Sequence, residues 1–180
     1  MACRLILVRH PPVNLAWQKR CYGQSDPGLS RAGQAMIGPL VSQIAARKPA
    51  AIVHSDLVRT RAIALPLARK LGIAAIAEPL WRERDFGTWE GRYWQAIYRQ
   101  TGNAMDGMID APDKFRPGGG ETTAEFAKRI EQAMAALPDV QSIAIIAHGG
   151  SIACVRARHG GAPLSQLGEL IPPAGSYTIL

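Results

Sequence analysis

The chain has 180 residues, of which 47% are hydrophobic and 19% are charged, so it can bury a core within one domain. Its 21 Lys and Arg residues against 14 Asp and Glu give a net charge of +7, which suits an anionic partner such as a phosphate ester. The basic residues are scattered, aromatic residues make up only 6%, and no apolar stretch approaches the length of a membrane span, so we expect no nucleic-acid or membrane partner.

The cysteines indicate a reducing environment. Cys3, Cys21 and Cys154 are odd in number and widely spaced, which fits neither a disulfide framework nor a zinc site. The first residues, "MACRLILVRH", carry too short an apolar run for a signal peptide. We therefore expect a cytoplasmic protein.

The first half of the chain alternates predicted strands and helices. Residues 4–8, "RLILV", predict a buried strand, and residues 29–48 predict a helix with Ser30 at its N-cap. A second strand is predicted over 50–55 and a second helix over 56–72.

The second half continues the alternation around a long irregular stretch. In chain order it predicts an extended segment over 73–81, a helix over 88–102, a loop or lid over 103–121, a helix over 122–138, a strand entering a glycine turn over 142–150 and a final strand over 175–180. Strands that alternate with helices predict an α/β fold, a three-layer α/β/α sandwich with a mostly parallel sheet. We expect a single domain over 1–180, with a small lid or insertion around 84–121.

Polar side chains gather where the predicted strands end. Arg9 and His10 follow the first strand, Arg59 lies just after the second, and His148 follows a later one. Glu83 comes soon after an extended segment. Because ligands bind at the carboxyl ends of parallel strands, neighbouring strands would bring these groups to one crevice. Guanidinium groups can hold phosphate oxygens, a histidine can attack phosphorus, and a carboxylic acid can protonate a leaving oxygen.

A cysteine phosphatase is a competing interpretation, because Cys3 and Arg9 form a Cys-x5-Arg pattern. Such a site needs a loop whose backbone N–H groups hold the phosphate. Here the five intervening residues are predicted as a strand, which would place the two side chains about 20 Å apart. We reject this interpretation.

Five motifs in order resemble those of the histidine phosphatase superfamily, which has the phosphoglycerate mutase-like fold. They are "VRHPP", "SDLVR", "LWRERDFGTWEG" with one extra residue before its glutamate, "PGGGET" and "AHGG". The stretch "CYGQSDPGLS" and the opening "RHPPV" further resemble the α-ribazole phosphatase branch, which acts in cobalamin biosynthesis.

The resemblance implies a metal-independent phosphomonoester hydrolase that forms a phosphohistidine. By match of motifs, His10 is the nucleophile, Glu83 the general acid and then base, and His148 a third catalytic group. Arg9, Arg59 and His148 would bind the phosphate, with Asn14 as a further ligand. No cofactor is implied, and the histidines at 10, 54, 148 and 159 lack a metal-ligand spacing.

The sequence departs from the family pattern at three positions. Pro11 replaces a glycine, Ala16 stands where many members have an asparagine, and Ile63 replaces a threonine. The functional interpretations of single residues also have structural alternatives, since Glu83 in "RERD" could form ion pairs and Glu90 could support a helix start.

The sequence is also compatible with two other functions. One is a phosphoglycerate mutase, which would isomerise its substrate, and the other is a catalytically weak phosphate-binding module. In each case the expected partner is a small-molecule phosphate ester, bound by a monomer or a homodimer.

Overall fold

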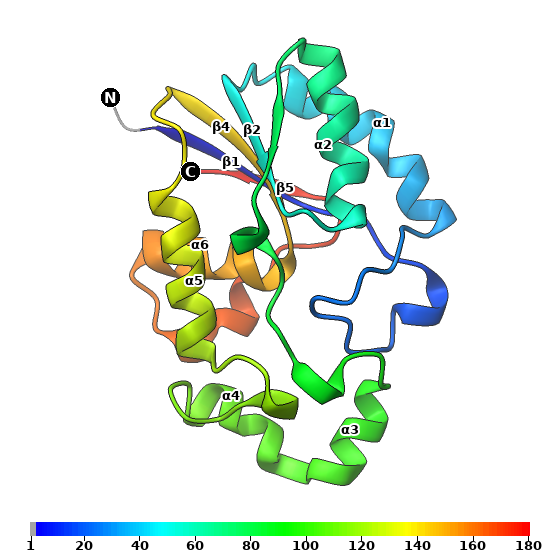
Figure 1. Cartoon of the computed structure of the whole chain (residues 1–180), viewed down its shortest axis with the longest axis vertical. Coiled ribbons are helices and arrows are strands. Elements are labelled where there is room, and N and C mark those ends of the chain that lie inside the picture. Colours follow the sequence, from blue (N-terminus) through cyan, green and yellow to red (C-terminus); the bar gives the residue numbers. More distant parts are fainter. Residues whose placement is uncertain (1–2) are drawn as a thin grey trace.

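The computed structural model describes residues 3–180 and has a five-stranded sheet at its centre (Figure 1). Its strands are β1 (Arg4–Arg9), β2 (Ala51–His54), β3 (Ala75–Ala77), β4 (Ser142–Ala147) and β5 (Tyr177–Ile179). They lie in the order β3-β2-β4-β1-β5, and all neighbours are parallel except β1 and β5. The predicted mostly parallel α/β fold is therefore confirmed.

Alternating side chains of the central strands point to opposite faces, as strand geometry requires. On β1, Leu7 packs with Ile143 and Ile145 of β4 into the core under α5 (Thr123–Ala135) and α6 (Gly149–Gly160). Ile6 and Val8 face the other way, toward α1 (Arg31–Ala45) and α2 (Val58–Leu71). The two helix pairs cover opposite faces of the sheet (Figure 1).

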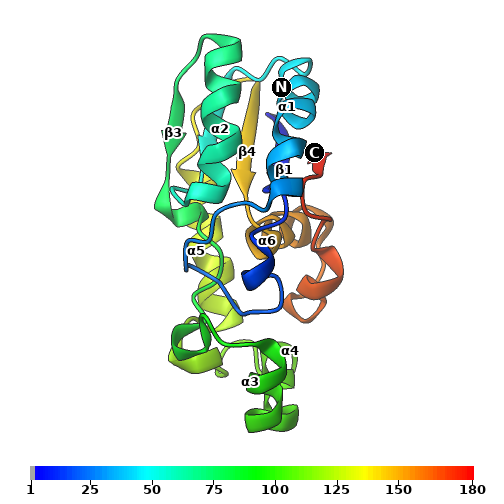
Figure 2. The ribbon, with the colours of Figure 1, turned by 90° about the vertical axis from the view of Figure 1, so that its right-hand side faces the viewer.

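A smaller part of the chain, separate from the sheet and the helix pairs that cover it, lies beyond the carboxyl ends of the parallel strands (Figure 2). It contains α3 (Trp94–Thr101) and α4 (Gly107–Asp110). It has a cluster of its own, in which Trp89 and Ile97 pack with the buried Cys21. No helix within residues 3–180 is both long enough and apolar enough to cross a membrane.

Two sequence predictions need correction, and one helix is missing from the sequence analysis. The helix predicted over 88–102 starts only at Trp94, because Gly87 and Gly91 adopt positive φ values of 51° and 81° and hold the preceding residues in a loop. The loop predicted over 103–121 contains α4 and two 3₁₀ turns. α6 was not predicted as a helix, because most of its residues are buried and it lacks an amphipathic pattern.

Candidate active site

Two histidines face each other at the carboxyl ends of neighbouring strands. Arg9 ends β1 and pairs in register with Ala147, which ends β4, so His10 and His148 both lie one residue beyond the sheet. The backbone N–H of His10 still donates to the carbonyl of Ala147, at 3.2 Å. The centroids of the two imidazole rings are 5.2 Å apart, and both side chains are buried.

A backbone carbonyl fixes the protonation of His10. Its Nδ1 lies 2.7 Å from the carbonyl oxygen of Pro11, which can only accept, so Nδ1 carries the proton and Nε2 keeps its lone pair. Burial, followed by the charges of Arg59 and Arg9, lowers the pKa of His10 to about 3. His10 is therefore a neutral imidazole with an available Nε2 at neutral pH.

His148 has the opposite tautomer. Arg59 donates a hydrogen bond from Nε to Nδ1 of His148 at 3.2 Å, so the ring proton is on Nε2. Burial and the charge of Arg59 hold the pKa of His148 well below its ordinary value. The Nε2–H group is buried and finds no acceptor within residues 3–180.

Arg59 is itself held by a loop that comes from far away in the sequence. Its Nη1 donates to the carbonyl of Ser25 at 2.7 Å, and its Nη2 donates to the carbonyl of Gly23 at 2.6 Å. The guanidinium carbon also lies 5.2 Å from the centre of the Tyr22 ring. At least three of the five N–H groups therefore bind the protein, and Arg59 orients His148 while its charge faces the site.

Glu90 anchors this loop, whereas the sequence suggested only that it supports the start of a helix. Its carboxylate accepts hydrogen bonds from the backbone N–H groups of Gln24 at 2.9 Å and Ser25 at 2.6 Å, and from the Ser25 hydroxyl at 2.6 Å. It thereby fixes the carbonyl groups that hold Arg59. The second glutamate of "LWRERDFGTWEG" was the signal in the sequence, but its partners lie about 65 residues earlier in the chain.

The side chain of Glu83 contacts the first turn of α6. One carboxylate oxygen accepts from the backbone N–H of Gly150 at 2.9 Å, and the other accepts from the N–H of Arg84 at 3.0 Å. Arg129 binds the backbone of this segment, donating to the carbonyls of Leu80 at 2.7 Å and Glu83 at 3.1 Å. The carboxylate therefore has a fixed orientation, and the expected ion-pair role in "RERD" goes instead to Arg82, which binds Asp56.

The side chain of Arg9, the last residue of β1, also approaches the first turn of α6. Its Nη1 donates to the carbonyl of Pro172 at 2.5 Å, while its Nε is buried and has no acceptor within the described residues. A Cβ atom at Gly149 would lie only 3.1 Å from the guanidinium carbon, so glycine permits the close approach. Arg9 and His148 thus present buried N–H donors that an anion can satisfy.

These groups open into a cavity of about 570 Å³. Arg9, Tyr22, Glu83 and Gly150 line it, and each of the two buried histidines is next in the sequence to a lining residue or one residue from it. The cavity thus gives a ligand access to Glu83 and Arg9 at the strand ends.

The structure does not bring Asn14 into this group. Its side-chain oxygen accepts from the N–H of Ala16 at 2.9 Å, and the residue is exposed and does not line the cavity. Of the three departures from the family pattern, Ala16 is also exposed, and Ile63 is buried in the core under α1 and α2. Pro11 lacks a donor but supplies the carbonyl that orients His10.

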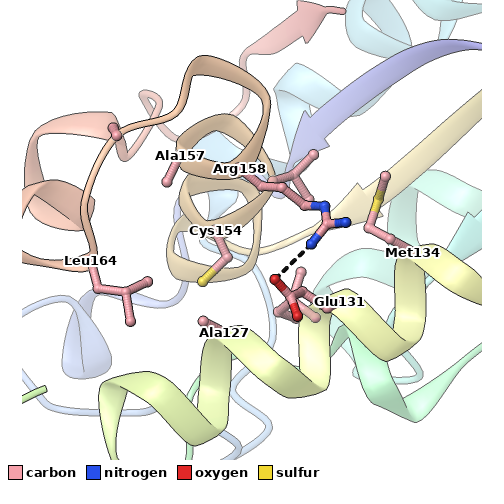
Figure 3. Close-up of a pocket in the computed structure, with 10 residues that line it drawn as sticks. Ala127, Glu131, Met134, Cys154, Ala157, Arg158 and Leu164 are labelled. Carbon is pink, nitrogen blue, oxygen red and sulfur yellow. Dashed lines mark hydrogen bonds and ion pairs between the residues drawn. The ribbon is translucent and has the colours of Figure 1, made fainter. Parts of the chain in front are cut away.

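A second cavity, of about 180 Å³, lies between α5 and α6 (Figure 3). Cys154 faces it beside Ala127 and Leu164, and Arg158 pairs with Glu131 across the two helices at 2.7 Å. Burial raises the pKa of the Cys154 thiol to about 12, so the reactive thiolate does not form at neutral pH. The larger cavity is lined by Arg9 and Glu83, and it is therefore the candidate active site.

The buried histidines predict acid sensitivity of the unliganded protein. Histidines in an unfolded chain titrate near about pH 6.5, whereas the folded pKa of His10 is about 3 and that of His148 is also lowered. The unfolded state therefore binds more protons below that pH, and stability falls as the pH drops toward 3. Each histidine contributes a loss of up to about 1.4 kcal/mol per pH unit.

Urea unfolding of the wild-type chain and of His10→Gln at pH 7, 6 and 5 measures this effect. We expect the wild-type chain to lose stability faster than the variant as the pH falls, because the variant lacks one of the titrating groups. Equal slopes for the two proteins would contradict the burial of a neutral His10.

Comparison with known proteins identifies the family. The sequence model described as "Histidine phosphatase superfamily (branch 1)" matches residues 5–180. The bifunctional protein Rv2228c of Mycobacterium tuberculosis is 31% identical over 131 residues, covering 72% of this chain and 35% of that protein. The chain thus spans about a third of the length of this protein, and of two further mycobacterial relatives with the same identity. The probable phosphoglycerate mutase GpmB of Serratia proteamaculans is 27% identical over 163 residues, covering 89% of this chain and 76% of the relative.

Solved structures share the whole fold. A mycobacterial glucosyl-3-phosphoglycerate phosphatase solved with VO3 has a TM-score of 0.85 and 26% identity, with 99% of this chain and 92% of that chain covered. The alpha-ribazole phosphatase of Shigella flexneri has a TM-score of 0.85 over 98% of this chain and 89% of its own, and at 21% identity this is a likeness of fold. The family match runs from the first strand to the last, and the chain belongs to the histidine phosphatase superfamily.

Proposed function

We propose that the chain is a phosphomonoester hydrolase that works through a phosphohistidine at Nε2 of His10. One observation carries the proposal: the neutral imidazole of His10 lies 5.2 Å, centroid to centroid, from that of His148, whose buried Nε2–H lacks an acceptor, as does the buried Nε–H of Arg9. Donors placed in this way can stabilise the charge that develops on a phosphoryl group during transfer. The VO3 in the mycobacterial phosphatase structure supports an oxyanion site in this fold.

The reaction follows in two balanced steps. Nε2 of His10 forms a bond to phosphorus while the bond to the leaving oxygen breaks, and a protonated Glu83 gives its proton to that oxygen. Glu83, now ionised, takes a proton from a water molecule, whose oxygen attacks phosphorus. The phosphorus–nitrogen bond breaks, inorganic phosphate leaves, and Glu83 is again protonated. Arg9, His148 and Arg59 hold the phosphoryl charge throughout.

A finer part of the proposal concerns the substrate. The stretch "CYGQSDPGLS" resembles the α-ribazole phosphatase branch, and we include α-ribazole 5′-phosphate, in cobalamin biosynthesis, as a candidate substrate. Phosphoglycerate mutase activity is the second candidate, favoured by the similarity to GpmB. The products separate the two activities, because a mutase returns an isomerised phosphoglycerate whereas a phosphatase releases inorganic phosphate.

Substitution of His10 tests the nucleophile. We expect the wild-type chain to hydrolyse a generic aryl phosphate in the presence of EDTA and to form an acid-labile, alkali-stable phosphoenzyme. His10→Ala removes the attacking nitrogen, so we expect a loss of kcat of about a thousandfold or more and no phosphoenzyme. His159→Ala, at the exposed end of α6, is the matched control. Full activity of His10→Ala, or complete loss of wild-type activity in EDTA, would overturn the mechanism.

Substitution of Glu83 tests the general acid. Glu83→Gln keeps one oxygen, for one of the two backbone donors, and has no acidic proton to give, so we expect kcat to fall by about 10²- to 10⁴-fold. The loss should be larger for an alkyl phosphate than for a nitrophenyl phosphate, whose leaving group needs no proton. Glu131→Gln, in the exposed pair with Arg158, is the control. Equal losses on both substrates would contradict the role of proton donor.

A further inference from the structure

The active-site cavity has two chemically different ends. Arg9 and Glu83 occupy the end near the strand termini, where the phosphoryl group would react. Aromatic side chains form much of the remaining wall, namely those of Tyr22, Phe86, Trp94 and Phe126. These residues come from three separate segments of the chain, so the aromatic surface does not depend on one element.

Two polar side chains of this wall, Arg84 and Thr123, are hydrogen-bonded to the protein itself. Arg84 is 7% exposed and donates from Nε and Nη2 to the carbonyl of Glu121, at 3.1 and 3.0 Å. The hydroxyl of Thr123 donates to the carbonyl of Met108 at 2.8 Å. The bonded groups of these two side chains are therefore not free to bind hydroxyl groups of a leaving group.

The charges of the wall also disfavour an acidic leaving group. The positive charge of Arg84 is attracted by the carboxylates of Glu121 and Glu83. Glu169 adds a further carboxylate on the exposed 3₁₀ segment Leu164–Leu170. A carboxylate on the substrate would have to compete with these groups for Arg84.

We propose that this cavity selects phosphate monoesters whose leaving group is uncharged, apolar and ring-bearing; the inference rests on the proposed function and names its substrate class. A flat ring gains from contact with the aromatic wall, whereas each sugar hydroxyl buried there without a partner is penalised. The cavity volume of about 570 Å³ is large enough for a phosphate together with a leaving group that carries a ring.

Three esters of primary alcohols provide the test, because their leaving oxygens have similar chemistry. We expect kcat/KM for 2-phenylethyl phosphate to exceed that for glucose 6-phosphate and for 3-phosphoglycerate by about tenfold or more, measured as released phosphate. An equal or higher value for either polar substrate would overturn the inference.

Two variants of exposed wall residues test the surface itself without disturbing the core. Ile109 and Ile171 line the cavity and are 52% and 43% exposed. We expect Ile109→Asn and Ile171→Asn each to lower the preference for 2-phenylethyl phosphate over glucose 6-phosphate severalfold. Ile76→Asn is the matched control, since Ile76 is 47% exposed on β3 and lies outside this cavity. An unchanged preference in both wall variants would contradict the assignment.

A binding experiment separates this inference from the proposed catalysis. Calorimetry with the non-hydrolysable phosphonate analogues of 2-phenylethyl phosphate and glucose 6-phosphate needs no turnover. We expect the phenylethyl compound to bind about tenfold more tightly. If this preference holds without any hydrolysis, the proposed function fails and the ligand class stands. If hydrolysis occurs and the two analogues bind equally, the ligand class fails and the proposed function stands.

Discussion

The site depends on the hydrogen bonds that hold the buried guanidinium of Arg59. A charge with no exposure to solvent is costly unless hydrogen bonds compensate it. Here the carbonyl groups of Gly23 and Ser25 provide that compensation, and Glu90 holds the loop that carries them. Its Nε–H is directed at His148 and sets the tautomer of that ring. Loop, arginine and histidine therefore form one connected unit.

The two histidines divide their roles because their neighbours differ. His10 faces a carbonyl oxygen and must keep its proton on Nδ1, whereas His148 faces an N–H donor and must keep its proton on Nε2. One ring thus offers a lone pair and the other a donor, within a ring separation of 5.2 Å. Pro11 is compatible with this arrangement, because the contact uses its carbonyl and not an N–H group.

The sequence predicted the sheet and the place of the site, and it failed where contacts span long distances along the chain. Arg9, His10 and His148 were predictable because short apolar runs end directly before them. The role of Glu90 was not, because it depends on a loop folding back by about 65 residues. α6 was hidden by burial on nearly all sides. For Asn14 the motif suggested a phosphate ligand, whereas its oxygen binds its own turn.

The site depends on the protonation of the two rings, and nitrogen-15 NMR of the histidine side chains measures it directly. At pH 7 we expect two neutral rings, with the proton on Nδ1 of His10 and on Nε2 of His148. Doubly protonated rings at this pH, or the same tautomer in both, would contradict this expectation, because His10 would then lack its attacking lone pair or His148 its donor.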